Sequence, residues 1–566
     1  MRLPNIWGQG ALFAFSGLEG ECRVHGCINA ALLGDLLGVR IHSSEMFDLY
    51  VLLDGIKDIE YEVVASDVIR ATLRDAQGLP QPVIFTFLNQ NTIVGLCGRG
   101  RVQLRSLRQV PVTSTVQGSV YRSGNSSFHF WKCDIDGISL FSFSTQGFQP
   151  VSQAQVNELA QRRVDWLAGF DALAPRDEEM RLTFLKCVSV MKSQVYTADG
   201  QFNQRWTTPN RLPHRWLWLW DSAFHALGNY ILDEGLAQDT LQSVMDVQKE
   251  DGFIPHLARP SFTSDITQPP ILCWSALKLF KRGGDRGFLG RILPGLEKYL
   301  AWNEANRTSP ATGLFMWHVN TTSTVCRADE SGMDNSPRFD GVGSMECIDF
   351  SCFMLNEYQC IASLCDAAAP ERAEDYRLKA KKLKQAINRY LWDEADKFYY
   401  DRLPESGDLH KVSSIASFLP LFAGACSARA AALLVRHLDD PASFATELPI
   451  PSVARCDVSF GTDMWRGPVW LNYNYMIAEG LRRYGYQDRA DALILKTLRA
   501  VCRYYMEDGV IYEMYDPDGR VSPRCLRRKG APIEPYDPRV RYQALRDYGW
   551  SSALFAAMVM ENARSK

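Results

Sequence analysis

The 566-residue sequence has no long apolar run, no excess of basic charge and no secretory pattern at its start. No stretch reaches the roughly 18 to 20 uninterrupted apolar residues that a membrane-spanning helix needs, so we expect no membrane partner. The net charge of -3, from 62 basic and 65 acidic side chains, leaves no basic footprint for a phosphate backbone, so we expect no nucleic acid partner. The first residues lack a basic segment followed by an apolar run. Together these absences predict a cytoplasmic protein.

Patterns that would hold a metal, a cofactor or a Ser nucleophile are also missing. The 15 cysteines are scattered without CxxC pairs, which is typical of reduced, buried thiols. Neither HExxH nor GxSxG occurs. The Gly-rich stretch at residues 95–100 lacks the GxGxxG order of a dinucleotide site. We therefore expect no cofactor and no metal.

The spacing of apolar residues changes near residue 150. Before it, short β-branched and aromatic runs alternate with Gly, Asn, Asp and Ser, which predicts an antiparallel β-sandwich over residues 1–150. Beyond it, apolar residues recur at helical intervals to the C-terminus. Broadly apolar helices joined by alternating short and long loops predict a closed ring of six helical hairpins, an (α/α)6 barrel, over residues 151–566.

Aromatic residues make up 11% of the chain, and some stand beside polar side chains. Trp216, Trp218 and Trp220 alternate immediately before Asp221. Alternate residues share one face of an extended segment, so they predict an aromatic wall on which a sugar ring can stack, with a carboxylate for its hydroxyls. Asp221 is also suited to cap the helix that follows. Gln268 precedes two prolines, which hold its backbone extended and aim its amide.

Two later segments place acids in unusual surroundings. The loop RADESGMDNSPRFDGVG holds several acids, among them Asp334, any one of which suits the role of a general acid. Glu513 lies between tyrosines in YEMYDPDG. Because these two acids are far apart in the sequence, a closed ring is needed to bring them to one pocket. Between them, the segment FGTDMWRGPVW surrounds a Gly-Pro turn with Trp465, Arg466 and Trp470.

In this order, the segments WLWLWDSAFHA, TQPP, SGMDNSPRFD, WRGPVWLNYNY and YEMYDPDG resemble glycoside hydrolase family 63, with a weaker likeness to the family 37 trehalases. The resemblance implies an (α/α)6 barrel and inverting hydrolysis of α-linked sugars at a non-reducing end. It implies that Asp334 is the general acid and Glu513 the general base. The full set of expected substrate contacts is Trp218, Trp220, Asp221, Gln268, Arg338, Trp465, Arg466 and Trp470.

The leading functional hypothesis is an inverting, exo-acting α-glucosidase that hydrolyses a short α-linked glucoside. Its partner is then a small sugar or oligosaccharide, and the near-neutral charge suits an uncharged substrate. The nearest alternative is a mannosylglycerate or glucosylglycerate hydrolase, which needs a cation for the glycerate carboxylate. Arg338 and Arg466 are the candidate cations. Asp329, five positions before the expected acid, stands where an aromatic residue is expected in such enzymes.

An alternative of another class is a sugar epimerase, which also uses helical rings but has paired histidines as acid and base. His214, His225 and His256 lie in polar and aromatic segments and keep this alternative open. Product analysis separates the two classes, because an epimer keeps the mass of the substrate whereas hydrolysis gives two fragments.

Overall fold

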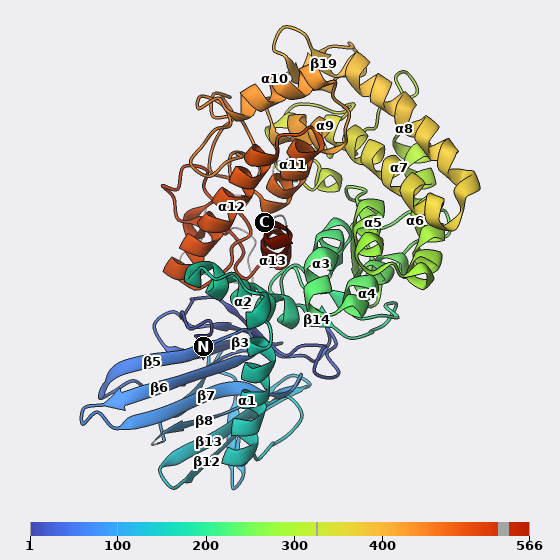
Figure 1. Ribbon diagram of the computed structural model, residues 1–566. Coiled ribbons are helices and arrows are strands. Elements are labelled where there is room, and N and C mark those ends of the chain that lie inside the picture. The colour runs from blue at the N-terminus through green and yellow to red at the C-terminus, as the bar shows by residue number, and fades with distance from the viewer. Residues whose placement is uncertain (1, 99, 324–325, 530–542, 565–566) are drawn as a thin grey trace.

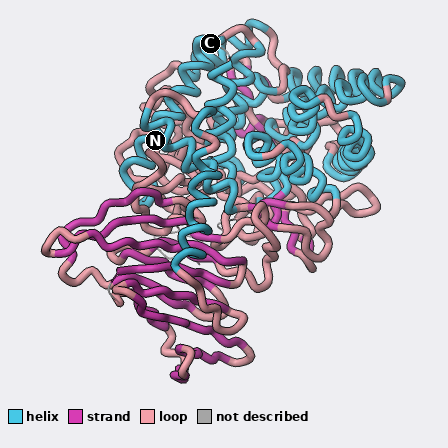
Figure 2. The backbone as a smooth tube through the Cα atoms, turned by 60° about the horizontal axis from the view of Figure 1, so that its bottom comes forward, coloured by secondary structure: helices cyan, strands magenta, loops and turns pink. Residues whose placement is uncertain are grey.

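The computed structural model describes residues 2–98, 100–323, 326–529 and 543–564. Antiparallel strands make up the N-terminal part of the chain, and helices make up most of the rest (Figure 1). Figure 2 shows the strands gathered on one side of the molecule and most helices on the other. In the described part of the chain, the helices are all too short or too polar to cross a bilayer. The cytoplasmic location stays a prediction.

The N-terminal strands form two antiparallel sheets within the described residues. The first has the order β1-β2-β3-β4-β9, and the second has the order β10-β11-β12-β13-β8-β7-β6-β5. The strands are β1 (Leu12–Ala14), β2 (Asn29–Leu32), β3 (Leu37–His42), β4 (Met46–Val51), β5 (Ile56–Val64), β6 (Val68–Asp75), β7 (Pro80–Asn89), β8 (Thr92–Gly98), β9 (Val102–Ser106), β10 (Val112–Thr115), β11 (Gly118–Ser123), β12 (Ser126–Ile135) and β13 (Ile138–Ser144).

Aromatic side chains join the two sheets. Phe47 of β4 lies 4.9 Å from Phe128 of β12 and 5.2 Å from Phe143 of β13, measured between ring centroids. Phe13 of β1 lies 4.7 Å from Phe87 of β7. Such pairs bury large apolar faces and supply much of the energy of a sheet-on-sheet core. The antiparallel N-terminal sheets predicted from the sequence are therefore present.

Helix α1 (Gln153–Ala168) covers the second sheet, where it contacts β6, β7 and β8. Ser152 caps its first turn by accepting a hydrogen bond from the backbone N–H of Gln155. The predicted boundary near residue 150 falls between β13 and this helix, and the division into two domains stays a prediction.

Six of the described helices form a closed ring of contacts, in which each contacts the next and α13 contacts α3 again. They alternate along the chain with helices that lie outside them (Figure 1). The ring consists of α3 (Leu219–Leu232), α5 (Leu272–Gly283), α7 (Ile348–Ala368), α9 (Leu419–Phe422), α11 (Leu471–Arg483) and α13 (Gly549–Arg564). The outer helices are α2 (Glu178–Ser193), α4 (Glu234–Met245), α6 (Arg286–Arg307), α8 (Pro370–Tyr390), α10 (Ala428–Leu438) and α12 (Gln487–Asp508).

The sequences of α7 and α8 explain their inner and outer positions. Helix α7 is rich in apolar and small residues on every face, and sixteen of its 21 residues are buried. Helix α8 is rich in Lys, Arg and Glu and buries only Ala373, Ala380, Leu383 and Ile387, which lie along one stripe. A helix that is apolar all round needs neighbours on all sides, whereas a stripe needs only one. The predicted helical region is therefore confirmed.

Short elements lie in the loops between the helices. They are the strands β14 (Val195–Tyr196), β15 (Trp206–Thr207), β16 (Leu217–Trp218), β17 (Leu257–Arg259), β18 (Phe262–Thr263), β19 (Trp392–Asp393), β20 (Phe398–Tyr399), β21 (Asp401–Arg402) and β22 (Leu409–His410), and the 3-10 helices η1 (Asp171–Leu173), η2 (Asp329–Ser331), η3 (Pro337–Phe339), η4 (Ile415–Phe418) and η5 (Pro523–Cys525).

Asp547 ties three distant parts of the chain together. Its buried carboxylate accepts hydrogen bonds from the backbone N–H of Leu12 at 2.7 Å and of Ile511 at 3.1 Å. It also pairs with Lys186 of α2 at 2.8 Å. A buried carboxylate needs such partners to offset its desolvation. Asp547 thereby fixes the segment that leads into Glu513 against both the first sheet and the helices.

Candidate active site

A pocket lies where the loops enter the N-terminal ends of the ring helices. Trp220 and Asp221 stand in the first turn of α3, and Trp470 immediately precedes α11. The residues that line the pocket are His214, Trp218, Trp220, Asp221, His256, Leu257, Gln268, Cys326, Asp329, Gly332, Asp334, Met464, Trp465, Trp470, Glu513, Arg528, Lys529, Tyr548 and Trp550. The ring thus brings together side chains from segments that are hundreds of positions apart.

Tryptophans form one wall of the pocket. Trp465 and Trp470 stack with ring centroids 4.1 Å apart and planes at 6°. Trp550 meets Trp220 edge-on at 5.1 Å and Trp470 at 5.7 Å. Among the described residues, the buried indole N–H groups of Trp465 and Trp550 meet no acceptor. A buried N–H without a partner is costly, so these groups are suited to the hydroxyls of a bound molecule.

The predicted wall of three alternating tryptophans is wrong in one member. Trp218 and Trp220 line the pocket, but Trp216 lies outside it, with the Arg259 guanidinium 4.9 Å from its ring centroid. The extended segment is only the two-residue strand β16, and the helix begins at Leu219. The alternation that places side chains on one face therefore does not hold across all three residues.

Asp221 is buried in the pocket, and its pKa is raised. Burial, together with the nearby charges of Glu513 and Asp334, raises the pKa of Asp221 to about 8, although the hydrogen bond from Tyr548 acts in the opposite direction. The Tyr548 hydroxyl lies 3.3 Å from its Oδ1. The residue stands inside the first turn of α3 and makes no cap, since the cap position is Trp218. At neutral pH Asp221 therefore offers both a donor and an acceptor.

We expect Asp221→Asn to stabilise the protein increasingly as the pH rises. The folded pKa of about 8 lies above the unfolded value of about 3.9, so the stability linked to this proton is complete at low pH and is lost as the pH rises toward 8. An amide has no such proton to lose. The Tm of the variant minus that of the wild type should grow from pH 5 to pH 8 and then level off, by an amount equivalent to about 2 to 4 kcal/mol. A difference that stays constant with pH would contradict a raised pKa.

Glu513 is held on one side of the pocket by Arg528. The Nε of Arg528 donates to Oε2 of Glu513 at 2.9 Å, and both side chains are almost fully buried. The backbone of Glu513 is fixed by its N–H, which donates to the Leu545 carbonyl at 3.0 Å. Burial lowers the pKa of Arg528, but the Glu513 charge outweighs this and the pKa is raised, so the guanidinium keeps its charge. Arg528 also contacts His214, with 3.1 Å between Nη2 and Nε2.

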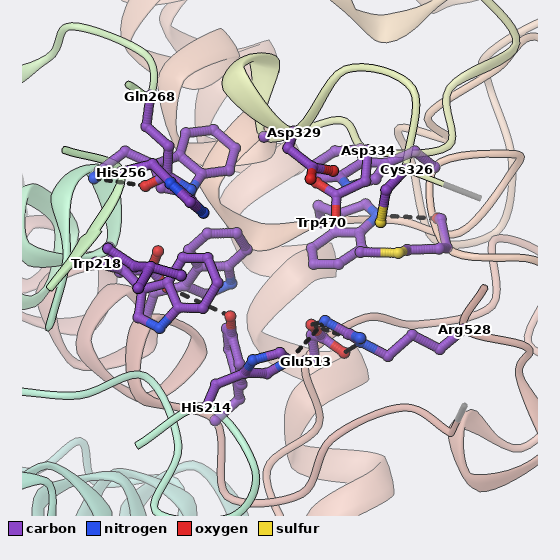
Figure 3. A pocket seen from close by; sticks show the side chains of 18 of the residues that line it. His214, Trp218, His256, Gln268, Cys326, Asp329, Asp334, Trp470, Glu513 and Arg528 are labelled. Atoms are coloured by element: carbon purple, nitrogen blue, oxygen red, sulfur yellow. Dashed lines mark hydrogen bonds and ion pairs between the residues drawn. The ribbon is translucent and has the colours of Figure 1, made fainter. Parts of the chain in front are cut away.

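Asp334 lies across the pocket from Glu513 in a small cluster with Cys326 and Asp329 (Figure 3). One ligand atom from each of these three residues lies within 4.8 Å of the others, so they form a donor set. The ammonium of Lys529 already pairs with Asp334 and lies 2.7 Å from the sulfur of Cys326. A cation therefore sits against two of the three donors, and this arrangement disfavours a metal ion there.

Two of the predicted substrate contacts do not reach the pocket. Arg338 is fully buried, and Asp349 and Asp401 accept four hydrogen bonds from its guanidinium at 2.7 to 3.0 Å, while the fifth N–H donates to the Met333 sulfur at 3.4 Å. Arg466 pairs with Asp340 outside the pocket lining. The prediction that Arg338 and Arg466 contact the substrate is therefore corrected. In an acid-rich loop each guanidinium pairs with a carboxylate of the protein instead.

Three histidines were candidates for the pocket, and two of them reach it. His214 and His256 line the pocket and meet the ring of Trp218 from two sides, each at 5.3 Å. Burial lowers the pKa of His256 to about 4, so this ring is neutral at pH 7. His225 instead lies outside the pocket lining with Thr207, 3.0 Å from its Nδ1. A neutral His256 acts as a hydrogen bonder, which disfavours an acid–base pair of histidines here.

Sequence reasoning missed the cations and the last two aromatic residues of the pocket. Arg528 and Lys529 belong to a run of three basic residues shortly after Glu513, and such a run usually marks a solvated surface. Tyr548 and Trp550 precede and open the last ring helix. Their aromatic character at a helix start, like that of Trp220 and Trp470, is the signal in the sequence that points to them.

A tryptophan-walled pocket that holds carboxylates on two sides, in a ring of helices, is the site of a glycoside hydrolase. Residues 214–551 match the family model described as the mannosylglycerate hydrolase MGH1-like glycoside hydrolase domain. The chain belongs to this family, which lies within glycoside hydrolase family 63. The family that the motifs predicted is thereby confirmed, and trehalases are also similar to the chain.

Named relatives extend over most of the chain. Mannosylglycerate hydrolase MGH1 of Selaginella moellendorffii is 25% identical over 65% of this chain and 91% of its own length. Mannosylglycerate hydrolase of Thermus thermophilus is 27% identical over 55% of this chain and 91% of its own length. A bacterial glucoamylase structure in complex with acarbose has a TM-score of 0.59 and covers 100% of this chain and 95% of that one, at 10% identity. This last similarity shows a shared fold that includes the N-terminal sheets.

Proposed function

We propose that the protein is an inverting, exo-acting α-glycosidase that releases one hexose from glycerate or a similar small hydroxy acid. The observation that carries the proposal is the joint presence, in one pocket, of Asp334, Glu513 and the ammonium of Lys529. The acids suit hydrolysis of a glycosidic bond, and the cation suits a carboxylate on the leaving group. The names of the two relatives above, both mannosylglycerate hydrolases, point to the same substrate class.

In this mechanism Asp334 donates a proton to the glycosidic oxygen while the bond from that oxygen to C1 breaks. A water on the opposite face of the sugar loses a proton to Glu513 and attacks C1, so the configuration at C1 inverts. The products are the free hexose and the hydroxy acid, with the proton of Asp334 now on the hydroxyl of the acid. Arg528 keeps Glu513 oriented, since it contacts both carboxylate oxygens.

The sugar itself would rest against the tryptophan wall. Trp218, Trp220, Trp465 and Trp470 offer ring faces, and the indole N–H groups of Trp218 and Trp465 meet no acceptor among the described residues, whereas that of Trp470 donates to the Met464 carbonyl. Asp221 offers a donor and an acceptor. The side-chain oxygen of Gln268 already accepts from the backbone N–H of Trp220 at 3.3 Å, which leaves its NH2 group for a hydroxyl. Enclosure by the wall on one side supports removal of a terminal sugar rather than cleavage within a chain.

The same proposal includes the architecture predicted from the sequence. Six described helices form a closed ring of contacts, and each of them has an outer helix before or after it along the chain. This arrangement supports an (α/α)6 barrel over residues 151–566. The β-sandwich of residues 1–150 is then a separate domain, and the phenylalanines that join its sheets do not line the pocket.

A second candidate is the α-glucosidase that the sequence favoured. The same carboxylates and tryptophan wall would serve it, but Lys529 would then have no partner in a neutral leaving group. The local charge at the pocket is consequently a better guide to the charge of the substrate than the net charge of -3 of the whole chain.

Hydrolysis of a substrate panel tests the proposal. The purified protein is incubated with mannosylglycerate, glucosylglycerate and α-linked glucose disaccharides, and the first anomer formed is followed by proton NMR. We expect cleavage of a glycerate glycoside with the β-anomer appearing first. Cleavage of the disaccharides alone would favour the α-glucosidase, an α-anomer would exclude inversion, and a product of unchanged mass would indicate an epimerase.

A further inference from the structure

A fully buried arginine, Arg211, stands between the N-terminal strands and the helices without a carboxylate partner among the described residues. Its guanidinium donates to the backbone carbonyls of Ser193 and Val195 at 2.8 Å and of Phe15 at 3.1 Å. Its Cζ lies 3.7 Å from the ring centroid of Tyr196. All of these partners are neutral, and a buried charge without a counter-ion is costly. The site therefore needs an anion from another neighbour.

Two cysteine sulfurs are the neighbours of Arg211 that can supply this anion. The Sγ of Cys22 lies 3.5 Å from Nη1 of Arg211, and the Sγ of Cys27 lies 3.9 Å from the same nitrogen. Burial raises the pKa of Tyr196, so its phenol stays neutral. A guanidinium does not lose its proton in proteins. The charge of Arg211 is therefore balanced when one of the two thiols is ionised.

Hydrogen bonds distinguish the two sulfurs. The Sγ of Cys22 donates to the Phe15 carbonyl at 3.4 Å, whereas the Sγ of Cys27 accepts from the side-chain NH2 of Asn29 at 3.5 Å. The hydrogen bond from Cys22 lowers the pKa of Cys27 and outweighs its burial, while burial raises the pKa of Cys22. Cys27 is thus the thiolate of the pair, and Cys22 keeps its proton. A thiolate, not a thiol, is the nucleophilic form of cysteine.

The cysteine pair lies beneath a surface loop and outside the pocket. Arg23, His25 and Gly26, which stand between the two cysteines, are exposed to solvent. Cys27 is itself 8% exposed, whereas Cys22 is fully buried. Neither cysteine lines the pocket. A small oxidant from solvent therefore meets Cys27 first, and Cys22 lies behind it as a second thiol.

We propose that Cys27 and Cys22 form a peroxide-sensitive modification site, with Cys27 as the nucleophile and Cys22 as the resolving thiol. The thiolate of Cys27 attacks one oxygen of hydrogen peroxide, the O–O bond breaks and hydroxide leaves, so Cys27 becomes a sulfenic acid. The sulfur of Cys22 then attacks the sulfur of Cys27. The sulfenic OH leaves as water with the proton of Cys22, and a disulfide forms. The two sulfurs lose two electrons and the peroxide gains them. Because a disulfide carries no charge, oxidation also removes the counter-ion of Arg211.

The test follows this disulfide in the reduced, full-length protein by tryptic peptide mapping. Trypsin cuts after Arg23, so a disulfide between Cys22 and Cys27 joins the peptides Leu3–Arg23 and Val24–Arg40. Hydrogen peroxide is added at about pH 6.5, where an ordinary thiol with a pKa of about 8.5 is almost fully protonated. N-ethylmaleimide in denaturant then ends the reaction and labels the remaining thiols.

We expect the joined peptides to form on the order of 10-fold faster than the exposed Cys456 loses its capacity for labelling, and dithiothreitol to separate them again. Asn29→Asp keeps the side-chain shape and places a carboxylate where Oδ1 lies 3.5 Å from Nη1 of Arg211. Cys27 then keeps its proton, so joining should slow on the order of 10-fold. Cys22→Ser should form no disulfide and accumulate a sulfenic acid on Cys27, which dimedone labels after unfolding.

The wild type alone decides the inference if a variant fails to fold. Peptides that join no faster than Cys456 is oxidised, or that join only after unfolding in urea, would overturn it. An unchanged rate in folded Asn29→Asp would also overturn it, because the thiolate would then not depend on the buried guanidinium.

Discussion

Replacement of Glu513 by Gln is expected to lower kcat on the order of 10³- to 10⁴-fold, with little change in KM. The amide keeps the shape of the side chain but takes no proton from water, so attack on C1 loses its base. The measurement is hydrolysis of the preferred substrate at pH 7, with the exposed Glu507→Gln on α12 as a matched control. Nearly wild-type turnover in Glu513→Gln would refute its role.

Folding must be assessed in the same samples, because Glu513 also neutralises the buried guanidinium of Arg528. Loss of one partner of a buried ion pair typically costs about 3 to 5 kcal/mol. Circular dichroism and thermal unfolding therefore accompany the kinetics, and a double variant with Arg528→Gln removes the unpaired charge. If the double variant folds like the wild type and remains inactive, loss of the base rather than loss of structure explains the effect.

A variant with a smaller side chain at position 513 tests from which face of the sugar C1 is attacked. Glu513→Ala opens space for azide, which needs no base to attack C1. With Asp334 still protonating the leaving oxygen, we expect azide to restore product formation from an α-glycoside as the β-glycosyl azide. An α-glycosyl azide would contradict attack from the face opposite the leaving group.

Replacement of Asp334 by Asn is expected to reduce turnover by an amount that depends on the leaving group. A hydroxy acid leaves as a poor, basic alkoxide unless it is protonated, so its hydrolysis should fall by about 10³- to 10⁴-fold. A nitrophenolate leaves without a proton, so a nitrophenyl α-glycoside of the same sugar should be affected far less. The kcat/KM of both substrates is measured for the wild type and the variant. An equal loss on both would show that Asp334 acts in some way other than as the acid.

The N-terminal strands, the helical remainder and the order of the site motifs are all predictable from local patterns. β-Branched and aromatic runs between turn residues predict the strand-rich N-terminal region, and apolar residues at helical intervals predict the helical region that follows it. Trp220, Asp221 and Trp470 are recognisable because the tryptophans stand beside a carboxylate and beside a Gly-Pro turn. The family resemblance rests on the same residues, so the sequence alone leads to a glycoside hydrolase.

The sequence did not decide which charges meet, because that depends on contacts between segments far apart in the chain. Arg338 and Arg466 stand in motifs beside the acid, yet each is paired with carboxylates outside the pocket, whereas Lys529 reaches Asp334 from the far side of the ring. Trp216 shows that a local pattern can also mislead within one segment. The strand before α3 has only two residues, so Trp216 does not share the face of Trp218 and Trp220.

The sequence by itself therefore determined the class of the protein and its strand-rich and helical regions, because these depend on local periodicity and on motifs read in order. Through the family resemblance it also predicted which two residues act as acid and base. Only the tertiary structure decided the neighbours of those acids. Closure of the ring placed Arg528 against Glu513 and Lys529 against Asp334, and in a buried pocket the nearest charge governs what a carboxyl can do. Because Lys529 lies in the pocket beside Asp334, the proposed substrate is the glycoside of an acid rather than a neutral glucoside.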